Sequence, residues 1–280
     1  MIPQYQHKVM TSFLLWFDNH LLTKGEAFSN KTGTLHYFDD SRLPDSYKSY
    51  SSPYKQWVTD SSISQANIPS SFMGSGRSDN IIFDFENGRI IETGGAFGTS
   101  ETITGTFAVK DFNVYLTNET EEDLILESKF VQNSRYGDSE SGIKPYDQAV
   151  PAIFINSETV QNVPFAFGGE DQTRMSIKAV VLAEDAYGLD GVLSICADTR
   201  HKNINLIPFS GHPITEYGDL KNGSYNYTTL ANSYANTEEP LYIEDVVVSK
   251  LSDKAQKQSI GDLKVGFIDF DIYQHRYPRL

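Results

Sequence analysis

Polar and apolar residues alternate along much of this chain, and a two-residue period of this kind predicts β-strands with one buried face. The alternation is clearest in residues 80–92 and 102–116, which predict four strands that follow one another as a meander. Asn87 and Gly88 separate two apolar-rich runs within this stretch. We predict a hairpin with a type I′ turn at this dipeptide, because that turn needs a positive φ at both central residues.

Near the start of the chain a helical period replaces the alternation, and residues 5–22 predict an amphipathic helix. Its apolar stripe contains Val9, Phe13, Trp16, Phe17 and Leu21. This stripe has two interpretations. It docks on a sheet of its own chain, or it forms an oligomer interface with a neighbouring copy, which a broad apolar face with a tryptophan suits.

Shorter elements are predicted along the rest of the chain. Strands are expected at residues 34–38, 54–59, 150–156, 163–168, 176–183, 203–208, 241–251 and 263–273, and a short helix at 189–199. Residues 121–131 suit a helix through their acidic start and a strand through the spacing of their leucines, and we favour the strand. Ile268, Phe270 and Ile272 form one apolar face, which predicts a central strand at the end of the chain.

Together these elements predict a mainly β protein of the α+β class. We expect an antiparallel core that resembles a β-sandwich or barrel, an N-terminal amphipathic helix, and extended loops at residues 39–80 and 210–240. A chain of 280 residues is long enough for one large domain or two smaller ones. We predict a single β-rich structural domain over residues 1–280.

The charge balance limits the classes of partner. The chain has 37 acidic and 23 basic residues, a formal net charge of -14. An acidic surface repels phosphate backbones, so sequence-independent binding to DNA or RNA is not expected. The acidity either keeps the protein dispersed or gives nucleic acid a surface along which it slides without binding.

The single cysteine and the apolar runs exclude several further classes. Cys196 lies in an apolar run, which predicts an inert buried thiol and excludes an intramolecular disulfide. The first residues lack the basic and apolar regions of a signal peptide. No apolar run approaches the roughly 18 residues of a membrane span, so no membrane partner is expected.

Candidate chemistry is sparse. Asp269, Asp271 and His275 share one face of the last predicted strand, where they could converge on a metal ion. The opposite face is apolar, so we interpret these side chains as the solvated or partner-facing side and expect neither a metal nor a cofactor. The sequence has no nucleophile elbow and no cysteine–histidine signature, and we predict no enzymatic activity.

A tyrosine-rich stretch is the remaining candidate binding site. It contains Tyr217, Tyr225, Tyr227 and Tyr234 among small polar residues. Tyrosine rings stack on sugars, and they are also enriched where protein subunits meet. We favour contact with a partner subunit over a sugar.

Three parts of the chain carry a family resemblance. They are the opening, residues 5–19 and 24–28; the stretch from 84–91 to 107–115; and the ending, residues 265–271. Together these parts resemble virion structural proteins of contractile-tailed bacteriophages, in the head-to-tail neck or tail-completion group.

The resemblance implies a homo-oligomeric ring, sixfold in this group, that joins the portal side of the capsid to the tail tube or sheath. Its partners would be other copies of itself and the neighbouring neck, tail tube or sheath proteins, and DNA would pass through without specific binding. The location would be the virion, assembled in the host cytoplasm. The alternatives are another tail, baseplate or collar part, or a carbohydrate- or receptor-binding β-module.

Overall fold

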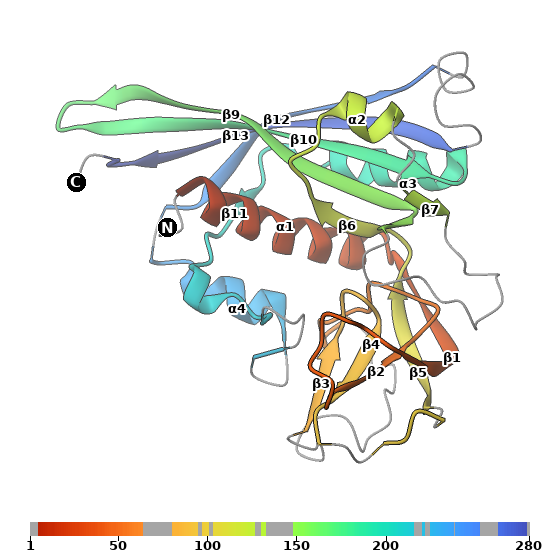
Figure 1. Ribbon diagram of the computed structural model, residues 1–280. Helices are drawn as coiled ribbons and strands as arrows, with labels where there is room; N and C mark the ends of the chain where they lie inside the picture. Colours follow the sequence, from red (N-terminus) through yellow and green to blue (C-terminus); the bar gives the residue numbers. More distant parts are fainter. Residues whose placement is uncertain are drawn as a thin grey trace.

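Two β-sheets lie above and below a long N-terminal helix in the computed structural model (Figure 1). The structure describes residues 5–63, 80–94, 97–100, 103–126, 130–132, 148–215, 220–221, 225–237, 239–252 and 263–278. The helix is α1 (Tyr5–Lys24), as the sequence predicts. The fold is mainly β and of the α+β class, which confirms the predicted fold class.

The larger sheet has six strands. Their order is β11 (Asn203–Ile204), β12 (Leu241–Lys250), β13 (Lys264–Arg276), β10 (Glu170–Ala183), β9 (Ala152–Ala166) and β6 (Asn113–Leu116). All neighbours are antiparallel except β6 and β9, which are parallel. Ile268, Phe270 and Ile272 are at most 2% exposed, and β13 lies between β12 and β10. The prediction of a central strand is therefore confirmed.

The smaller sheet has five strands, all antiparallel to their neighbours. Their order is β3 (Ile81–Asp84), β4 (Arg89–Glu92), β2 (Lys48–Ser51), β1 (Phe28–Phe38) and β5 (Ile103–Lys110). A short parallel pair, β7 (Phe130–Gln132) and β8 (Gln148–Val150), stands apart. The described residues also form helices α2 (Glu121–Leu126), α3 (Ala186–Ala197) and α4 (Tyr227–Tyr234) and the 3₁₀ turn η3 (Phe209–Gly211).

The predicted meander is wrong in its connections, although its four strands exist. Only β3 and β4 form a hairpin; β5 pairs with β1, and β6 joins the other sheet. The hairpin loop covers residues 85–88, and within it only Gly88 has a positive φ, 63°. The turn is therefore not type I′. It is stabilised instead by a side chain, since the N–H of Asn87 donates a hydrogen bond to Asp84 Oδ1 at 3.0 Å.

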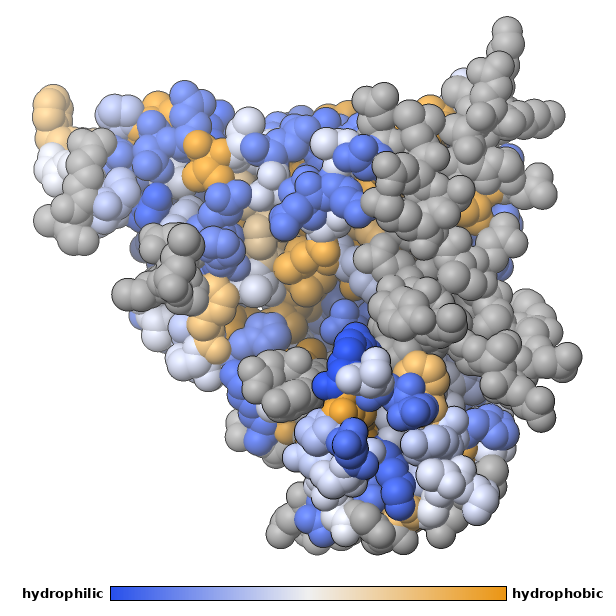
Figure 2. All heavy atoms as spheres, in the orientation of Figure 1, coloured by the Kyte–Doolittle hydropathy of each residue, from blue (hydrophilic) through white to orange (hydrophobic). Residues whose placement is uncertain are grey.

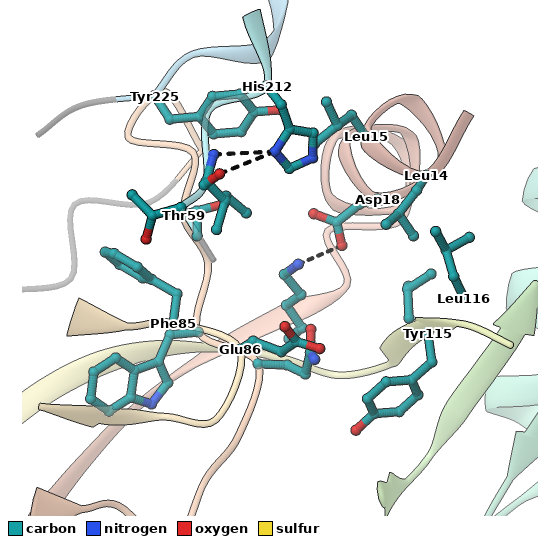
Figure 3. A pocket seen from close by; sticks show the side chains of 16 residues that line it. Leu14, Leu15, Asp18, Thr59, Phe85, Glu86, Tyr115, Leu116, His212 and Tyr225 are labelled. Atoms are coloured by element: carbon teal, nitrogen blue, oxygen red, sulfur yellow. Dashed lines mark hydrogen bonds and ion pairs between the residues drawn. The ribbon is translucent and has the colours of Figure 1, made fainter. Parts of the chain in front are cut away.

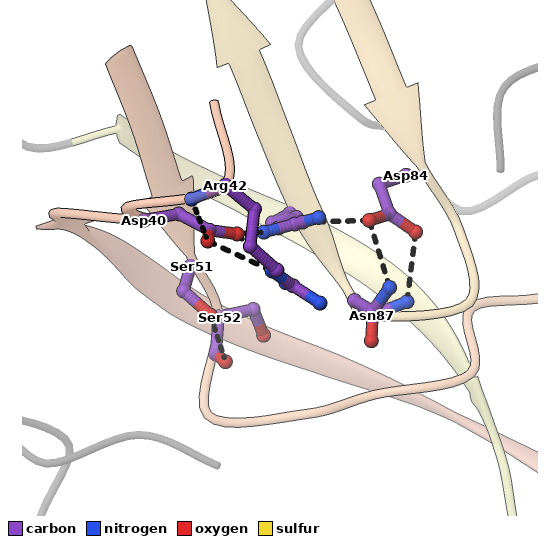
Figure 4. A network of polar contacts seen from close by, with 7 residues as sticks. Asp40, Arg42, Ser51, Ser52, Asp84 and Asn87 are labelled. Carbon is purple, nitrogen blue, oxygen red and sulfur yellow. Dashed lines mark hydrogen bonds and ion pairs between the residues drawn. The ribbon is translucent and has the colours of Figure 1, made fainter. Parts of the chain in front are cut away.

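A buried arginine fastens this hairpin to the loop that follows β1 (Figure 4). Arg89 Nε donates to Asp84 Oδ2 at 2.6 Å, and its guanidinium also binds Asp40. Hydrogen bonds from Arg42 and then Arg89 hold the pKa of Asp40 well below its usual range, although burial opposes this shift. The start of the predicted loop 39–80 is therefore an anchored segment.

Residues 121–131 contain helix α2, so the favoured strand is wrong there. Asp123 N–H donates to Thr120 Oγ1 at 3.2 Å, and Thr120 N–H donates to Asp123 Oδ2 at 3.4 Å. This reciprocal pair satisfies the free amides at a helix start, which decides the ambiguity in favour of the helix. Strand β7 follows at residue 130.

Several predicted boundaries also change. The runs 150–156 and 163–168 belong largely to one long strand, β9; the run 203–208 contains only two strand residues; and the run 54–59 contributes only the isolated bridge Trp57–Val109. Loop 39–80 includes strand β2, loop 210–240 includes helix α4, and residues 64–79 lie outside the described residues. Helix α3 and its buried face with Cys196 are as predicted.

Candidate functional site

A cavity of about 440 Å³ opens between α1 and the smaller sheet. In Figure 3, Asp18 of α1 faces this space together with His212 and Glu86. Asp18 and Lys110 of β5 form an ion pair at 2.6 Å, which links the helix to the smaller sheet across the cavity. The apolar part of the wall includes Leu14, Leu15, Phe85, Val114, Leu116 and Ile214.

Burial shifts the pKa of two titratable groups of the cavity toward the neutral form. Burial and then the charge of Asp84 raise the pKa of Glu86. Burial lowers the pKa of His212, whose Nδ1 accepts the N–H of Ile214 at 3.4 Å. Within the described part of the wall no hydrogen bond joins Glu86 to His212, so the geometry shows a partly apolar hollow with the Asp18–Lys110 ion pair and no arranged acid–base pair.

The predicted oligomer stripe of α1 lies inside the molecule. Val9, Phe13, Trp16, Phe17 and Leu21 are all at most 7% exposed. The ring centroids of Phe13 and Phe270 are 5.1 Å apart, which packs the helix on the larger sheet. The interface interpretation is therefore replaced by the alternative of docking on the chain's own sheet, because these side chains have no surface left for another copy.

Two of the four candidate tyrosines are also in the core. Tyr225 and Tyr227 are 7% and 8% exposed, and burial raises the pKa of both hydroxyls. The Tyr227 N–H donates to Asp60 Oδ2 at 3.1 Å, so Asp60 holds the start of α4. Tyr234 is half-buried against the same core, and Tyr217 lies outside the described residues. Neither Tyr225 nor Tyr227 is therefore available at the outer surface to stack on a sugar or a partner, and Tyr225 borders only the cavity beside α1.

The acidic face of β13 carries an ion-pair cluster. Lys178 of β10 lies opposite Asp269 and binds Glu158 at 2.9 Å and Glu121 at 3.2 Å. These two carboxylates hold the pKa of Lys178 above its usual range, and burial raises the pKa of Asp269. Asp271 accepts a hydrogen bond from Ser176, while the ring of His275 contacts Phe165 at a centroid distance of 4.2 Å, with the two ring planes tilted by 49°. Among the described residues, no group of three such side chains is arranged to hold a metal ion.

An exposed arm, the end of the β9–β10 hairpin, is a feature that the sequence patterns above do not predict. Figure 1 shows this hairpin extending from the sheet beyond α1, and Figure 2 shows apolar atoms at its far end. Phe165 is 60% and Phe167 fully exposed, and Val160 along the same strand is 40% exposed. The signal was present in the sequence, because Gly168-Gly169 after two phenylalanines predicts a hairpin tip, and both glycines have a positive φ, 102° and 90°.

Both edges of the larger sheet are partly open within the described residues. Strand β6 covers β9 only along Ala152–Ile155, and beyond it β9 pairs with β10 alone. On the other edge β11 covers the start of β12, and backbone hydrogen bonds join residues 201 and 202 to Ile243. From Asp245 onward β12 pairs with β13 alone. Open edges present unpaired backbone groups to which another strand can bind.

Comparison with known protein families and with curated proteins finds no match to this chain. In the described residues, no helix combines the length and the apolar character needed to cross a membrane.

Proposed function

We propose that this protein is a structural virion protein that forms a homo-oligomeric ring in the head-to-tail neck of a contractile-tailed bacteriophage. In this role it joins the portal side of the capsid to the tail tube or sheath, as a tail-completion or terminator protein. The family resemblance of the three sequence segments suggests the virion, and the shape of the chain supports a subunit of an assembly.

The observation that carries the proposal is the arm of β9 and β10. A strand that extends from its sheet with an open edge and exposed phenylalanines is unusual in a protein that works alone, because such features favour association. An arm of this kind suits contact between subunits. The net charge of -14 is also consistent with a ring through which DNA passes without binding.

The sugar-binding alternative has lost its main support. It rested on the tyrosine-rich stretch, where Tyr225 and Tyr227 are buried. We therefore do not propose it further. Another tail, baseplate or collar position would use the same arm, and the choice between these positions is made by identifying the neighbours in the virion.

Light scattering and negative-stain microscopy of the purified protein, alone and with a tail-tube or portal partner, test the proposal. We expect closed rings with a central hole. Replacing both arm phenylalanines, Phe165→Ser with Phe167→Ser, should shift the rings toward monomers, since it removes exposed apolar contacts. Tyr187→Ser is the matched control, because Tyr187 is an aromatic side chain that is 90% exposed on α3, away from the arm. A wild-type chain that stays monomeric beside every partner would overturn the proposal.

A further inference from the structure

We infer that successive copies of this chain join edge to edge, with the open edge of β9 in one copy pairing with the open edge of β12 in the next. The larger sheet would then continue from subunit to subunit. This inference rests on the proposed function, since it specifies how the ring is closed.

Strand direction fits this pairing. Strand β9 is antiparallel to β10, β10 to β13, and β13 to β12, so β9 and β12 run in opposite directions within one copy. When a second copy is placed beside the first in the same orientation, its β12 is antiparallel to the first copy's β9. The added strand continues the alternation of the sheet, which is the arrangement that antiparallel ladders require.

The regular parts of the two edges have similar lengths, five residues in β9 and six in β12. In β9 a bulge at Glu158 and the proline at 164 enclose the regular run 159–163. In β12 a bulge at Glu244 precedes the regular run from Asp245 to Lys250. Bulges and prolines interrupt pairing, so these two runs are the parts of each edge that can accept a strand.

The face of each side chain selects a register. Val160 lies opposite Met175 and Val248 opposite Ile268, so both valines are on the face of the sheet that carries the core. They are 40% and 36% exposed, and pairing them would bury both. In this register Gln161 faces Val247. Asp245 is the one charged residue among the paired positions, 159–163 and 245–249, and it already has Arg200 at 3.3 Å, so no like charges oppose each other.

The two short covering strands explain why the copies must be offset. Within one copy Gln161 is level with Tyr242, and Asn203 of β11 already occupies the position beside Tyr242. A second copy without offset would place its arm on β11. Moving Val160 from the level of Ile243 to Val248 shifts the arm by the four ladder positions from Ile272 to Ile268, about 14 Å, because Glu244 is bulged. The run 159–163 then lies beside 245–249, which neither β11 nor β6 covers, and the arm tip beyond Pro164 meets β11 of the next copy.

One contact repeated in this way is heterologous, because a different surface of each copy takes part. Repetition by rotation then closes a ring, whereas repetition without closure gives an open filament. The geometry of the edges thus supplies a single repeated contact that needs no other protein.

Disulfide cross-linking tests the pairing. In the variant Val160→Cys with Val248→Cys, the two cysteines of one chain are separated by β10 and β13, about 14 Å across three strand spacings, beyond the roughly 7 Å limit between Cα atoms. A disulfide can therefore form only between copies. The native Cys196 does not interfere, since it is 1% exposed and burial raises its pKa to about 12.

After mild oxidation we expect a ladder of covalent oligomers on a non-reducing gel that stops at the number of copies in the ring. Each single variant should give at most dimers. The control pair Val160→Cys with Tyr187→Cys places the second thiol on α3, and we expect its products beyond the dimer to be at least fivefold less abundant.

The outcomes separate this inference from the proposed function. Assembled rings by light scattering without a ladder would overturn the edge pairing and leave the ring intact. A ladder that grows without a stop would support the pairing and overturn the closed ring. A chain that neither assembles nor cross-links would overturn both.

Discussion

Helix α1 and the β9–β10 arm are both rich in large apolar side chains, yet their surroundings are opposite. Phe13 on the helix is 0% exposed, whereas Phe167 at the arm tip is fully exposed. The helix lies between the two sheets and is buried on most of its sides, while the arm has a sheet neighbour only on one edge. Apolar composition therefore indicates that burying a segment is favourable, but not whether the surface that buries it belongs to the same chain or to another.

The comparison also moves the expected association surface. The sequence suggests the helix stripe as the interface, and the fold uses that stripe for its own core. The sequence predicts two separate strands where β9 is one long strand, which β10 follows to its end and which extends past β6 on its other edge. The two regions can be distinguished by experiment, because changes in the helix should affect folding and changes in the arm should affect assembly.

The largest expected effect is that of Phe13→Asp. A carboxylate at this site would be buried without a partner between α1 and β13, so we expect a loss of more than about 4 kcal/mol in the free energy of unfolding, measured in urea. Phe167→Asp is the matched control at the arm tip and should change this free energy by less than about 0.5 kcal/mol while weakening assembly. Equal destabilisation by the two variants would contradict the distinction between core helix and exposed arm.

A smaller effect is expected from His20, a second buried group of α1. Its ring stacks on Trp16 at a centroid distance of 5.3 Å, and burial, then Lys202 and Lys24, lower its pKa to about 4. The unfolded chain takes up this proton near pH 6.5, so between pH 6.5 and 4 the unfolded state binds more protons than the folded state. Stability should fall as the pH falls through this window, by about 1 to 3 kcal/mol in total, and this contribution should level off below pH 4.

Urea unfolding as a function of pH measures this effect as a difference between variants. His20→Gln should remove this part of the pH dependence. His7→Gln, on the exposed side of the same helix, should leave the profile as in the wild type. Identical profiles for His20→Gln and the wild type would show that His20 is not buried as a neutral side chain.

The smallest expected effect is that of Gly168→Ala at the arm tip. A φ of 102° strains any residue with a Cβ, although no atom lies within 4 Å of that position, so the cost is confined to the backbone, about 1 kcal/mol. Hydrogen exchange should become faster at the ends of β9 and β10. Gly191→Ala in α3 also has open space but helical backbone, and it should stabilise the protein by about 0.5 to 1 kcal/mol. A stabilising Gly168→Ala would show that the arm tip does not use this turn.

The parts of the fold that are predictable from sequence are those with a strong local signal. Helix α1, helix α3 with its buried face, and the central strand β13 follow from periodicity in single segments. The position of the β3–β4 hairpin follows from Asn87-Gly88, but its turn type does not, because the side chain of Asp84 provides a competing bond. Helix α2 was missed, although Thr120 and Asp123 carry a cap signal at its start.

The cavity and the open sheet edges could not be predicted from the sequence, and the reason is physical. The cavity brings together Asp18, Glu86, Lys110 and His212 from four distant segments, and no local pattern predicts that these segments meet. The open edges are equally non-local, since an edge exists only where no other strand pairs, and that depends on where β6 and β11 end. The resemblance to phage neck proteins remains a prediction that assembly experiments can test.

By itself the sequence determined the class of the fold, the main periodic elements and the acidic, aromatic-rich character of the chain, because these depend on local alternation and on composition. Only the tertiary structure decided which apolar faces meet within the chain. It enclosed the α1 stripe and two tyrosines, and it left the β9 arm and the end of β12 open, because burial depends on the joint arrangement of both sheets around the helix rather than on any one segment.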